Sequence, residues 1–150
     1  MKSKILTQST GECIYILVFE SGDEVMKSLK DFAQTNKLSG SSFTAIGAFS
    51  KLTVGYFNWE KKEYKKIEIN EQVEVLSLIG DVSLKEDGSL QLHAHVVVGK
   101  SDGTAHGGHL MEAYVRPTLE LVLTETPQAL QRKYDPESGI ALINIKEFNF

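Results

Sequence analysis

The chain has 150 residues, of which 41% are hydrophobic and 24% are charged, which excludes a disordered chain and is typical of a single globular domain spanning 1–150. Its 16 Lys and Arg residues are outnumbered by 20 Asp and Glu residues, so the formal net charge is −4. This acidity argues against tight nucleic-acid binding through a basic surface.

The single cysteine and the N-terminal residues indicate a cellular setting. Cys13 has no partner in the chain, so intrachain disulfides are excluded and a reducing, cytoplasmic location is favoured. The first 15 residues lack the continuous apolar stretch and cleavage site of a signal peptide. No apolar run reaches the length of a membrane span. We therefore expect a cytoplasmic protein that does not interact with membranes.

The first predicted elements are a strand and the main helix. Residues 13–20 are apolar on both faces, which is typical of an interior strand. Ser21 and Glu24 have the spacing of a capping box, so a helix is predicted over about residues 23–36. The apolar positions of this helix recur at helical spacing and should face the sheet: Val25, Leu29, Phe32 and Ala33.

Several β-strands should follow the helix. Strands at 42–49 and 52–59 lead into a polar turn, and residues 64–69 return as the second arm of a hairpin. Residues 74–82 and 90–98 are separated by a short turn, which predicts adjacent antiparallel strands.

The C-terminal third should contain three more strands and a short helix. Residues 110–115 and 119–124 form strands separated by Arg116-Pro117, because proline cannot donate to the ladder and marks a break, bulge or edge. Thr126 and Pro127 suggest the start of a short second helix over about 127–134, and residues 141–145 form a last strand. The tail ends in two aromatics, Phe148 and Phe150, which a monomer must expose or tuck in.

Together these elements predict an α+β domain in which a mostly antiparallel sheet is packed by one main helix. Glycines within strand-like runs suggest bulges or bends and hence a curved sheet: Gly47, Gly55 and Gly80.

The four histidines of the chain all lie between His93 and His109. His93 and His95 alternate on a strand, so both side chains share one face. The Gly- and Asp-rich segment 99–104 should reverse the chain and return His109 to this pair. His106 has the character of a solvent-facing loop residue.

Three neighbouring histidines suggest a metal site at His93, His95 and His109. Imidazole binds zinc and related metals, and three histidines with an open fourth position occur in catalytic zinc sites. We therefore expect a divalent metal such as zinc, which would make hydrolysis chemically available. The alternative is a polar histidine cluster that packs at a subunit boundary.

Residues around the histidines supply further candidates. Glu112 is the candidate catalytic carboxylate, with a surface carboxylate as the alternative. Asp102 is better explained as a turn residue, and Asp81 should lie at a strand end. Gly107 and Gly108 are candidate ligand-binding positions, because a backbone without Cβ atoms can pass close to a bulky group.

The histidine region also resembles a known family. The run HAHVVVGKSDGTAHGGHL, preceded by VEVLSLIGDVSL and followed by VRPTLELVLTE, resembles the PPC (plants and prokaryotes conserved) domain. The segments 22–25 and 43–50 match its early blocks, so the resemblance covers nearly all of the chain. In plants this domain follows AT-hook segments in nuclear proteins, and in bacteria and archaea it stands alone.

The resemblance implies a compact homotrimeric domain whose metal site is formed by His93, His95 and His109. The leading hypothesis is a stand-alone trimeric module that binds a metal or small ligand, with weak hydrolytic activity. The alternative is a DNA-associated protein that acts without an AT-hook, since the chain lacks the Arg-Gly-Arg-Pro core of that motif. A third hypothesis is an interaction protein whose function is trimerisation itself.

Overall fold

The computed structural model describes residues 1–145, and within them the chain forms nine strands and one helix. In chain order the elements are β1 (Lys2–Ser9), β2 (Glu12–Glu20), α1 (Val25–Thr35), β3 (Ser41–Asn58), β4 (Glu63–Ile69), β5 (Val73–Leu84), β6 (Leu90–Gly99), β7 (Ala105–Glu125), β8 (Arg132–Asp135) and β9 (Ile140–Ile143). The mostly antiparallel α+β fold expected from the sequence is confirmed. The aromatic tail residues Phe148 and Phe150 lie outside the described residues.

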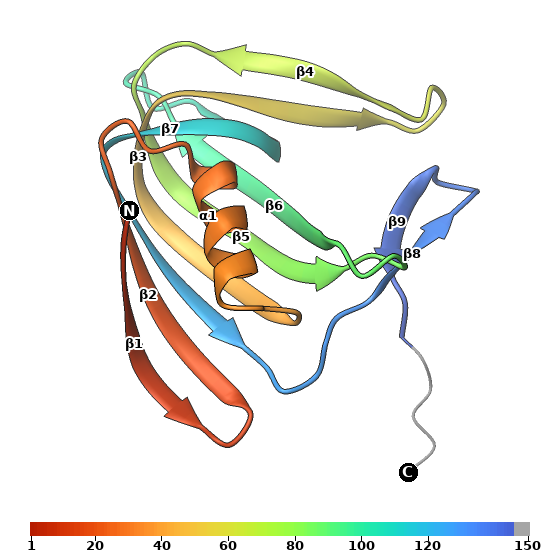
Figure 1. Cartoon of the computed structure of the whole chain (residues 1–150). Helices are drawn as coiled ribbons and strands as arrows, with labels where there is room; N and C mark the ends of the chain where they lie inside the picture. Colours follow the sequence, from red (N-terminus) through yellow and green to blue (C-terminus); the bar gives the residue numbers. More distant parts are fainter. Residues whose placement is uncertain (146–150) are drawn as a thin grey trace.

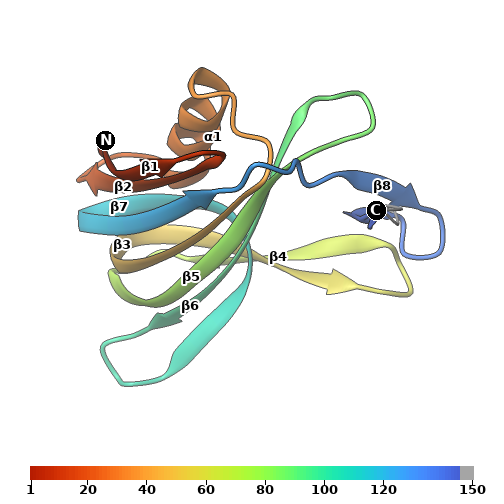
Figure 2. The same ribbon diagram turned by 90° about the horizontal axis from the view of Figure 1, so that it is seen from below.

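Seven strands form one curved antiparallel sheet in the order β1-β2-β7-β6-β5-β3-β4 (Figures 1 and 2). The two longest strands, β3 and β7, also pair with each other. Strands β3, β5, β6 and β7 therefore close into a ring, in which β7 pairs with both β6 and β3. The β6–β7 hairpin places the start of β7 beside β6, where the histidines lie, and closure of the ring places the same part of β7 beside β3.

Helix α1 lies across the inner face of the sheet, as Figure 1 shows, and completes the core. Its four predicted apolar positions, from Val25 to Ala33, are all buried. They meet buried sheet residues such as Phe19 and Phe49. Each fully buried side chain of this size contributes about 1.5–3 kcal/mol, so the helix is held mainly by its apolar stripe.

The N-terminus of α1 is capped differently from the prediction. Glu24, and not Ser21, is the N-cap: its carboxylate accepts from the amides of Met26 and Lys27 at 3.2 and 2.6 Å. The Ser21 hydroxyl instead donates to the carbonyl of Pro117 at 3.2 Å. The capping-box prediction is therefore wrong, because the chain turns at Gly22 and the helix begins later than expected.

Strand β7 is continuous through Pro117, which follows a cis peptide bond. The ladder between β3 and β7 shifts register here, since Gly47 pairs with Leu119 while Phe49 pairs with Val115. Of the outcomes expected for Pro117, the structure shows a bulge. Gly47 has φ 151°, and a Cβ there would clash with the carbonyl oxygen of Thr118, which explains the glycine at this bend.

The short second helix predicted over 127–134 is wrong. Residues 127–131 contain no helix, and β8 pairs with β9 as a separate two-stranded hairpin. The hydroxyl of Thr126 donates to the carbonyl of Gly40 at 2.8 Å and so does not cap a helix. The turn of the hairpin is set by Asp135, whose carboxylate accepts from the amide of Ser138 at 2.8 Å.

The remaining predictions of strands are largely confirmed. The hairpins β3–β4 and β5–β6 form as expected, and β9 occupies most of the predicted last strand. Strand β1 was not predicted. Within residues 1–145, no helix has the length and apolar character needed to cross a membrane.

Candidate metal centre

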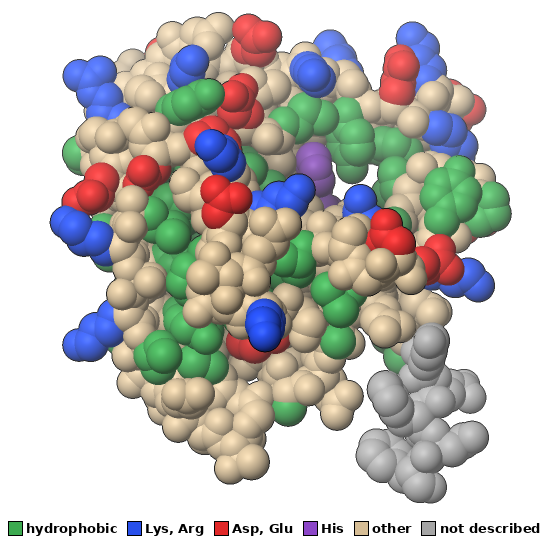
Figure 3. All heavy atoms as spheres, in the orientation of Figure 1, with side chains coloured by type: hydrophobic (Ala, Val, Ile, Leu, Met, Phe, Trp, Pro, Cys, Tyr) green, Lys and Arg blue, Asp and Glu red, His purple; other side chains and the backbone are tan. Residues whose placement is uncertain are grey.

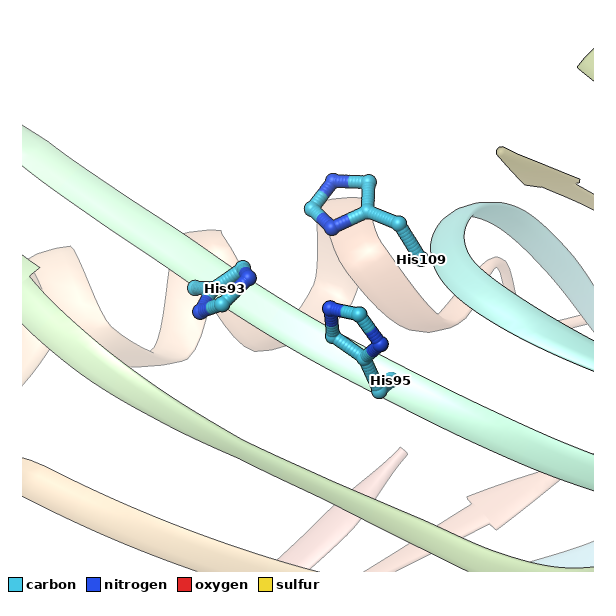
Figure 4. A group of neighbouring side chains, drawn as sticks. All are labelled: His93, His95 and His109. Atoms are coloured by element: carbon cyan, nitrogen blue, oxygen red, sulfur yellow. The ribbon is translucent and has the colours of Figure 1, made fainter. Parts of the chain in front are cut away.

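The hairpin between β6 and β7 brings three histidines together. His95 pairs directly with His109 across the two strands, and His93 lies two residues along β6 on the same face. One ring nitrogen from each of the three histidines lies within 4.8 Å of the others. Figure 4 shows the three rings around a shared gap. The predicted convergence of these imidazoles is confirmed.

The spacing and hydrogen bonding of the rings fit a metal ion. Two nitrogens bound to one tetrahedral zinc lie about 3.3 Å apart, so modest side-chain rotation would bring these rings into coordination distance. Nδ1 of His109 is buried and has no hydrogen-bond partner among residues 1–145. An unpaired buried ring nitrogen is costly, and a metal ion would satisfy it.

The surroundings favour a neutral His109. Burial, followed by the nearby His93, His95 and Arg132, lowers the pKa of His109 to about 4. Burial and the neighbouring His93 likewise lower the pKa of His95. His109 is therefore neutral at pH 7, which leaves one ring nitrogen free to bind a metal.

An aromatic side chain from another hairpin fixes the ring of His109. Tyr64 of β4 stacks on His109, with ring centroids 4.9 Å apart and planes 29° from parallel. Phe57 of β3 packs against Tyr64 in turn, at 5.1 Å. The β3–β4 hairpin thus forms an aromatic wall beside the histidines.

A buried ion pair lies on the other side of the cluster. Asp81 of β5 pairs with His93 in the ladder, and its Oδ2 lies 3.5 Å from Nδ1 of His93. Arg132, at the start of β8, donates through NH2 to both oxygens of Asp81 at 2.9 and 2.8 Å. Burial opposes ionisation of Asp81, but the hydrogen bonds from His93 and Arg132 outweigh it, so the pKa of this carboxyl is lowered.

One further polar group lies beside the cluster on β6. Gln91 is two residues before His93 on the same face of the strand, and its Oε1 is buried without a hydrogen-bond partner in the described part of the chain. In the space-filling view, a histidine is visible in a recess of the surface (Figure 3). His95 is exposed while His93 and His109 are partly buried, so the centre lies at the surface, and the unpaired Gln91 oxygen lies along the same strand face.

The two predicted glycines have a packing explanation. A Cβ on Gly107 would lie 2.5 Å from the carbonyl oxygen of Val96, and one on Gly108 would lie 2.8 Å from that of Gly55. These glycines let β7 fit between β6 and β3 at the closure of the ring. Close backbone approach, which the sequence suggested, is therefore seen here between neighbouring strands.

The structure does not bring Glu112 to the histidines. Its carboxylate is exposed and accepts a hydrogen bond from the hydroxyl of Tyr114 at 2.7 Å. It lines a surface pocket with Lys66 and Glu68, and no histidine lines that pocket. This geometry matches the alternative interpretation of Glu112, that of a surface carboxylate.

The other sequence candidates also fall outside the three-histidine group. Asp102 is a turn residue, as expected, and accepts from the amide of Thr104 at 2.9 Å. His106 is exposed and pairs with Val98 at the far end of the hairpin. Arg132 was missed by the sequence reasoning, because its segment was assigned to a helix.

Comparison with known proteins supports the assignment of fold and family. The family model of the Plants and Prokaryotes Conserved (PCC) domain matches residues 7–127. Among curated proteins, no sequence matches this chain.

Three solved structures are similar over most of their length. A plant- and prokaryote-conserved (PPC) protein from Pyrococcus horikoshii is 32% identical, with a TM-score of 0.82 over 98% of this chain and 97% of that one. A metal-containing protein from Archaeoglobus fulgidus is 34% identical, with a TM-score of 0.79 over 88% and 93%. A protein from Bacteroides thetaiotaomicron, provisionally described as DNA binding, is 28% identical, with a TM-score of 0.84 over 95% and 96%.

Proposed function

Because this chain belongs to the Plants and Prokaryotes Conserved (PCC) domain family, we propose that it is a trimeric module that binds a divalent metal through His93, His95 and His109. The observation that carries this proposal is the convergence of three ring nitrogens within 4.8 Å. The unpaired, buried Nδ1 of His109 supports it. The metal-containing relative from Archaeoglobus fulgidus is a further reason to expect a bound ion.

Metal analysis of protein purified without an affinity tag tests this proposal. After incubation with zinc and removal of the excess, the wild-type protein should retain about one ion per chain. The double variant His93→Ala/His95→Ala should retain none, because a single imidazole cannot hold the ion. His106→Ala is the matched control, since His106 is exposed and outside the cluster. Wild-type protein that stays metal-free after zinc addition would refute the metal site.

The chemistry of the donor set also allows a small ligand to bind at the metal. Three neutral imidazoles leave the charge of the ion uncancelled, so zinc held there would supply Lewis acidity at an open fourth position. The ring of Tyr64, which stacks on His109, lies beside the cluster and could contact such a ligand. We propose that the module hydrolyses such a ligand weakly. The single cysteine, Cys13, favours a reducing, cytoplasmic setting for it.

Trimerisation is the second part of the proposal. Strands β3, β5, β6 and β7 expose large apolar side chains on the outer face of the sheet, here called the outer apolar face: Ile46, Leu76, Ile79, Val97 and Val122. Four of these five line one shallow pocket. A cluster of exposed apolar residues on a sheet is typical of a protein–protein contact. We infer that further copies of the chain cover this face.

DNA association is the second candidate function, and the description of the relative from Bacteroides thetaiotaomicron favours it. The net charge of −4 opposes it, because phosphate contacts require clustered basic residues. A mobility-shift assay with duplex DNA at about 50 mM salt, where phosphate contacts are strongest, separates the two functions. A shift that weakens with added salt would favour DNA binding over the metal module alone.

A further inference from the structure

We propose that Asp81, held in place by Arg132, is a positioning residue that fixes the tautomer of His93 for ligand binding. The inference rests on the proposed metal site and names two residues that act on it without contacting the ligand. Asp81 comes from β5 and Arg132 from the separate β8–β9 hairpin, so three elements converge on this one ring.

The side chain of Arg132 is buried and makes its hydrogen bonds to other groups of the protein. Its side chain is only 6% exposed. The Nε atom donates to Oγ of Ser83 at 2.8 Å, NH1 donates to the carbonyl of Ala141 at 3.1 Å, and NH2 donates to both oxygens of Asp81. With all three nitrogens engaged, Arg132 is poorly placed to receive an anionic ligand. Its guanidinium is instead held by these contacts and directs one nitrogen at both oxygens of the Asp81 carboxylate.

Nδ1 of His93 faces two groups that require opposite tautomers. Oδ2 of Asp81 lies 3.5 Å away and can only accept a hydrogen bond, whereas NH2 of Arg132 lies 3.3 Å away and can only donate. If Nδ1 carries the proton, it donates to Asp81 and leaves the Nε2 lone pair free. If Nδ1 accepts from Arg132, Nε2 carries the proton and cannot bind a metal.

The shorter bonds within the ion pair decide between these tautomers. NH2 of Arg132 is closer to the Asp81 oxygens, at 2.9 and 2.8 Å, than to His93. The hydrogens of NH2 are therefore directed mainly at the carboxylate. A proton on Nδ1 of His93 would face the ionised carboxylate of Asp81 at 3.5 Å and would be stabilised by its charge. Ligand histidines in metal sites commonly donate their second N–H to such an acceptor.

Two measurements on Asp81→Asn test this inference. In the metal-free wild type, long-range ¹H–¹⁵N NMR should show the proton of His93 on Nδ1. In Asp81→Asn the new amide group can donate to Nδ1, so the proton should move to Nε2. Zinc affinity, measured by competition with a chelating dye, should fall by about 10- to 100-fold. Asp87→Asn is the matched control, because it removes a fully exposed carboxylate in the turn of the same β5–β6 hairpin.

The double variant Asp81→Asn/Arg132→Gln guards against misfolding. It removes both charges, so no unpaired buried charge remains if Asp81→Asn alone unfolds. Its zinc affinity should fall as in the single variant. A wild-type His93 protonated on Nε2, or variants that bind zinc as tightly as Asp87→Asn, would overturn the positioning role while leaving the metal site intact. If the wild type binds no zinc, the proposed function fails, and the tautomer comparison alone decides the role of Asp81.

Discussion

His109 is the residue whose surroundings depart most from those of a free histidine. It is partly buried, stacks on Tyr64 and shares the gap with two other imidazoles. Burial and the neighbouring imidazoles disfavour a positive charge on its ring, while Tyr64 fixes the orientation of the ring. A metal ion competes with protons for a histidine nitrogen, so a low pKa extends metal binding to lower pH. The same features that keep His109 neutral thus prepare it as a ligand.

The first prediction concerns the pH dependence of the metal-free protein. The pKa of His109 falls from 6.5 to about 4 on folding, so between these values the unfolded state binds more protons than the folded state. The free energy of unfolding should therefore decrease as the pH is lowered from 6.5 towards 4. Urea unfolding across this range and an NMR titration of the His109 ring measure it. Titration of His109 near 6.5, or an equal pH slope in His109→Gln, would contradict the prediction.

Individual site residues differ in how readily the sequence predicts them. The return of His109 to a position near His93 and His95 follows from an HxH strand and a reversing loop, whereas its direct pairing with His95 does not. Asp81 could also have been placed, because the β5–β6 ladder pairs Leu84 with Leu90, and counting three residues along each strand puts Asp81 opposite His93. Arg132 could not, since it is 51 residues from Asp81 and no local pattern links them.

At the level of elements, Glu24 joins the helix to the sheet. Its carboxylate caps α1 and also accepts from the amide of Ala113 in β7 at 3.1 Å. One side chain therefore satisfies backbone donors in two elements. The capping box predicted from the sequence would have accepted only from backbone amides at the start of the helix. The N-cap residue could therefore not be identified without the position of β7.

The second prediction compares the two residues of that assumed capping box. Glu24→Ala should lower the free energy of unfolding by about 1–2 kcal/mol, because the helix loses its cap and the amide of Ala113 loses its acceptor. Ser21→Ala should change it by less than about 0.5 kcal/mol, since the hydrogen bond from its hydroxyl to Pro117 is exposed. Urea denaturation measures both. Equal losses in the two variants would restore Ser21 as the cap.

The third prediction concerns the fit of β7 between its neighbours. Gly108→Ala should destabilise the protein by about 1–3 kcal/mol, because the new Cβ would lie 2.8 Å from the carbonyl oxygen of Gly55 and push β3 away. Gly99→Ala, at the end of β6, is the matched control. Its nearest neighbour would be a side-chain atom of Leu76 at 3.4 Å, an ordinary contact. Thermal unfolding of both variants should show a loss only for Gly108→Ala.

The β8–β9 hairpin shows why some elements escape prediction from sequence. Thr126-Pro127 has the local pattern of a helix start, but the Thr126 hydroxyl is engaged by the carbonyl of Gly40, far away in the chain. The hairpin is anchored instead by Arg132, which reaches Asp81 and Ser83 on β5. Long-range contacts therefore override the local helix signal, and only the assembled sheet supplies them.

At the level of the whole molecule, the closed ring of β3, β5, β6 and β7 divides the residues into two sets. Residues that alternate into the ring form the core with α1, including Ala94, Val96 and Val98 of β6. Residues of the opposite face of the same strand include His93, His95 and Val97. The histidines and part of the outer apolar face thus share one side of one strand. Alternation predicted that His93 and His95 share one face, whereas closure of the ring depends on the pairing of β3 with β7.

This arrangement places the candidate metal centre next to the surface through which we infer that the chain trimerises. Ile79 of β5 pairs directly with His95 of β6, so the outer apolar face borders the histidine cluster. A substitution intended to test trimerisation alone should therefore avoid Ile79. Ile46 is the better choice, because it lies on β3 and is 64% exposed.

The fourth prediction is that Ile46→Asp dissociates the trimer without unfolding the chain. In a trimer a buried carboxylate would face apolar side chains of another copy, which is costly, whereas in the free chain this side chain faces water. Light scattering after size exclusion should give about three chains for the wild type and about one for Ile46→Asp. Leu6→Asp on β1 is the matched control, because Leu6 is 55% exposed and lies outside the outer apolar face. A monomeric wild type, or a trimer that survives Ile46→Asp, would exclude this face as the trimer contact.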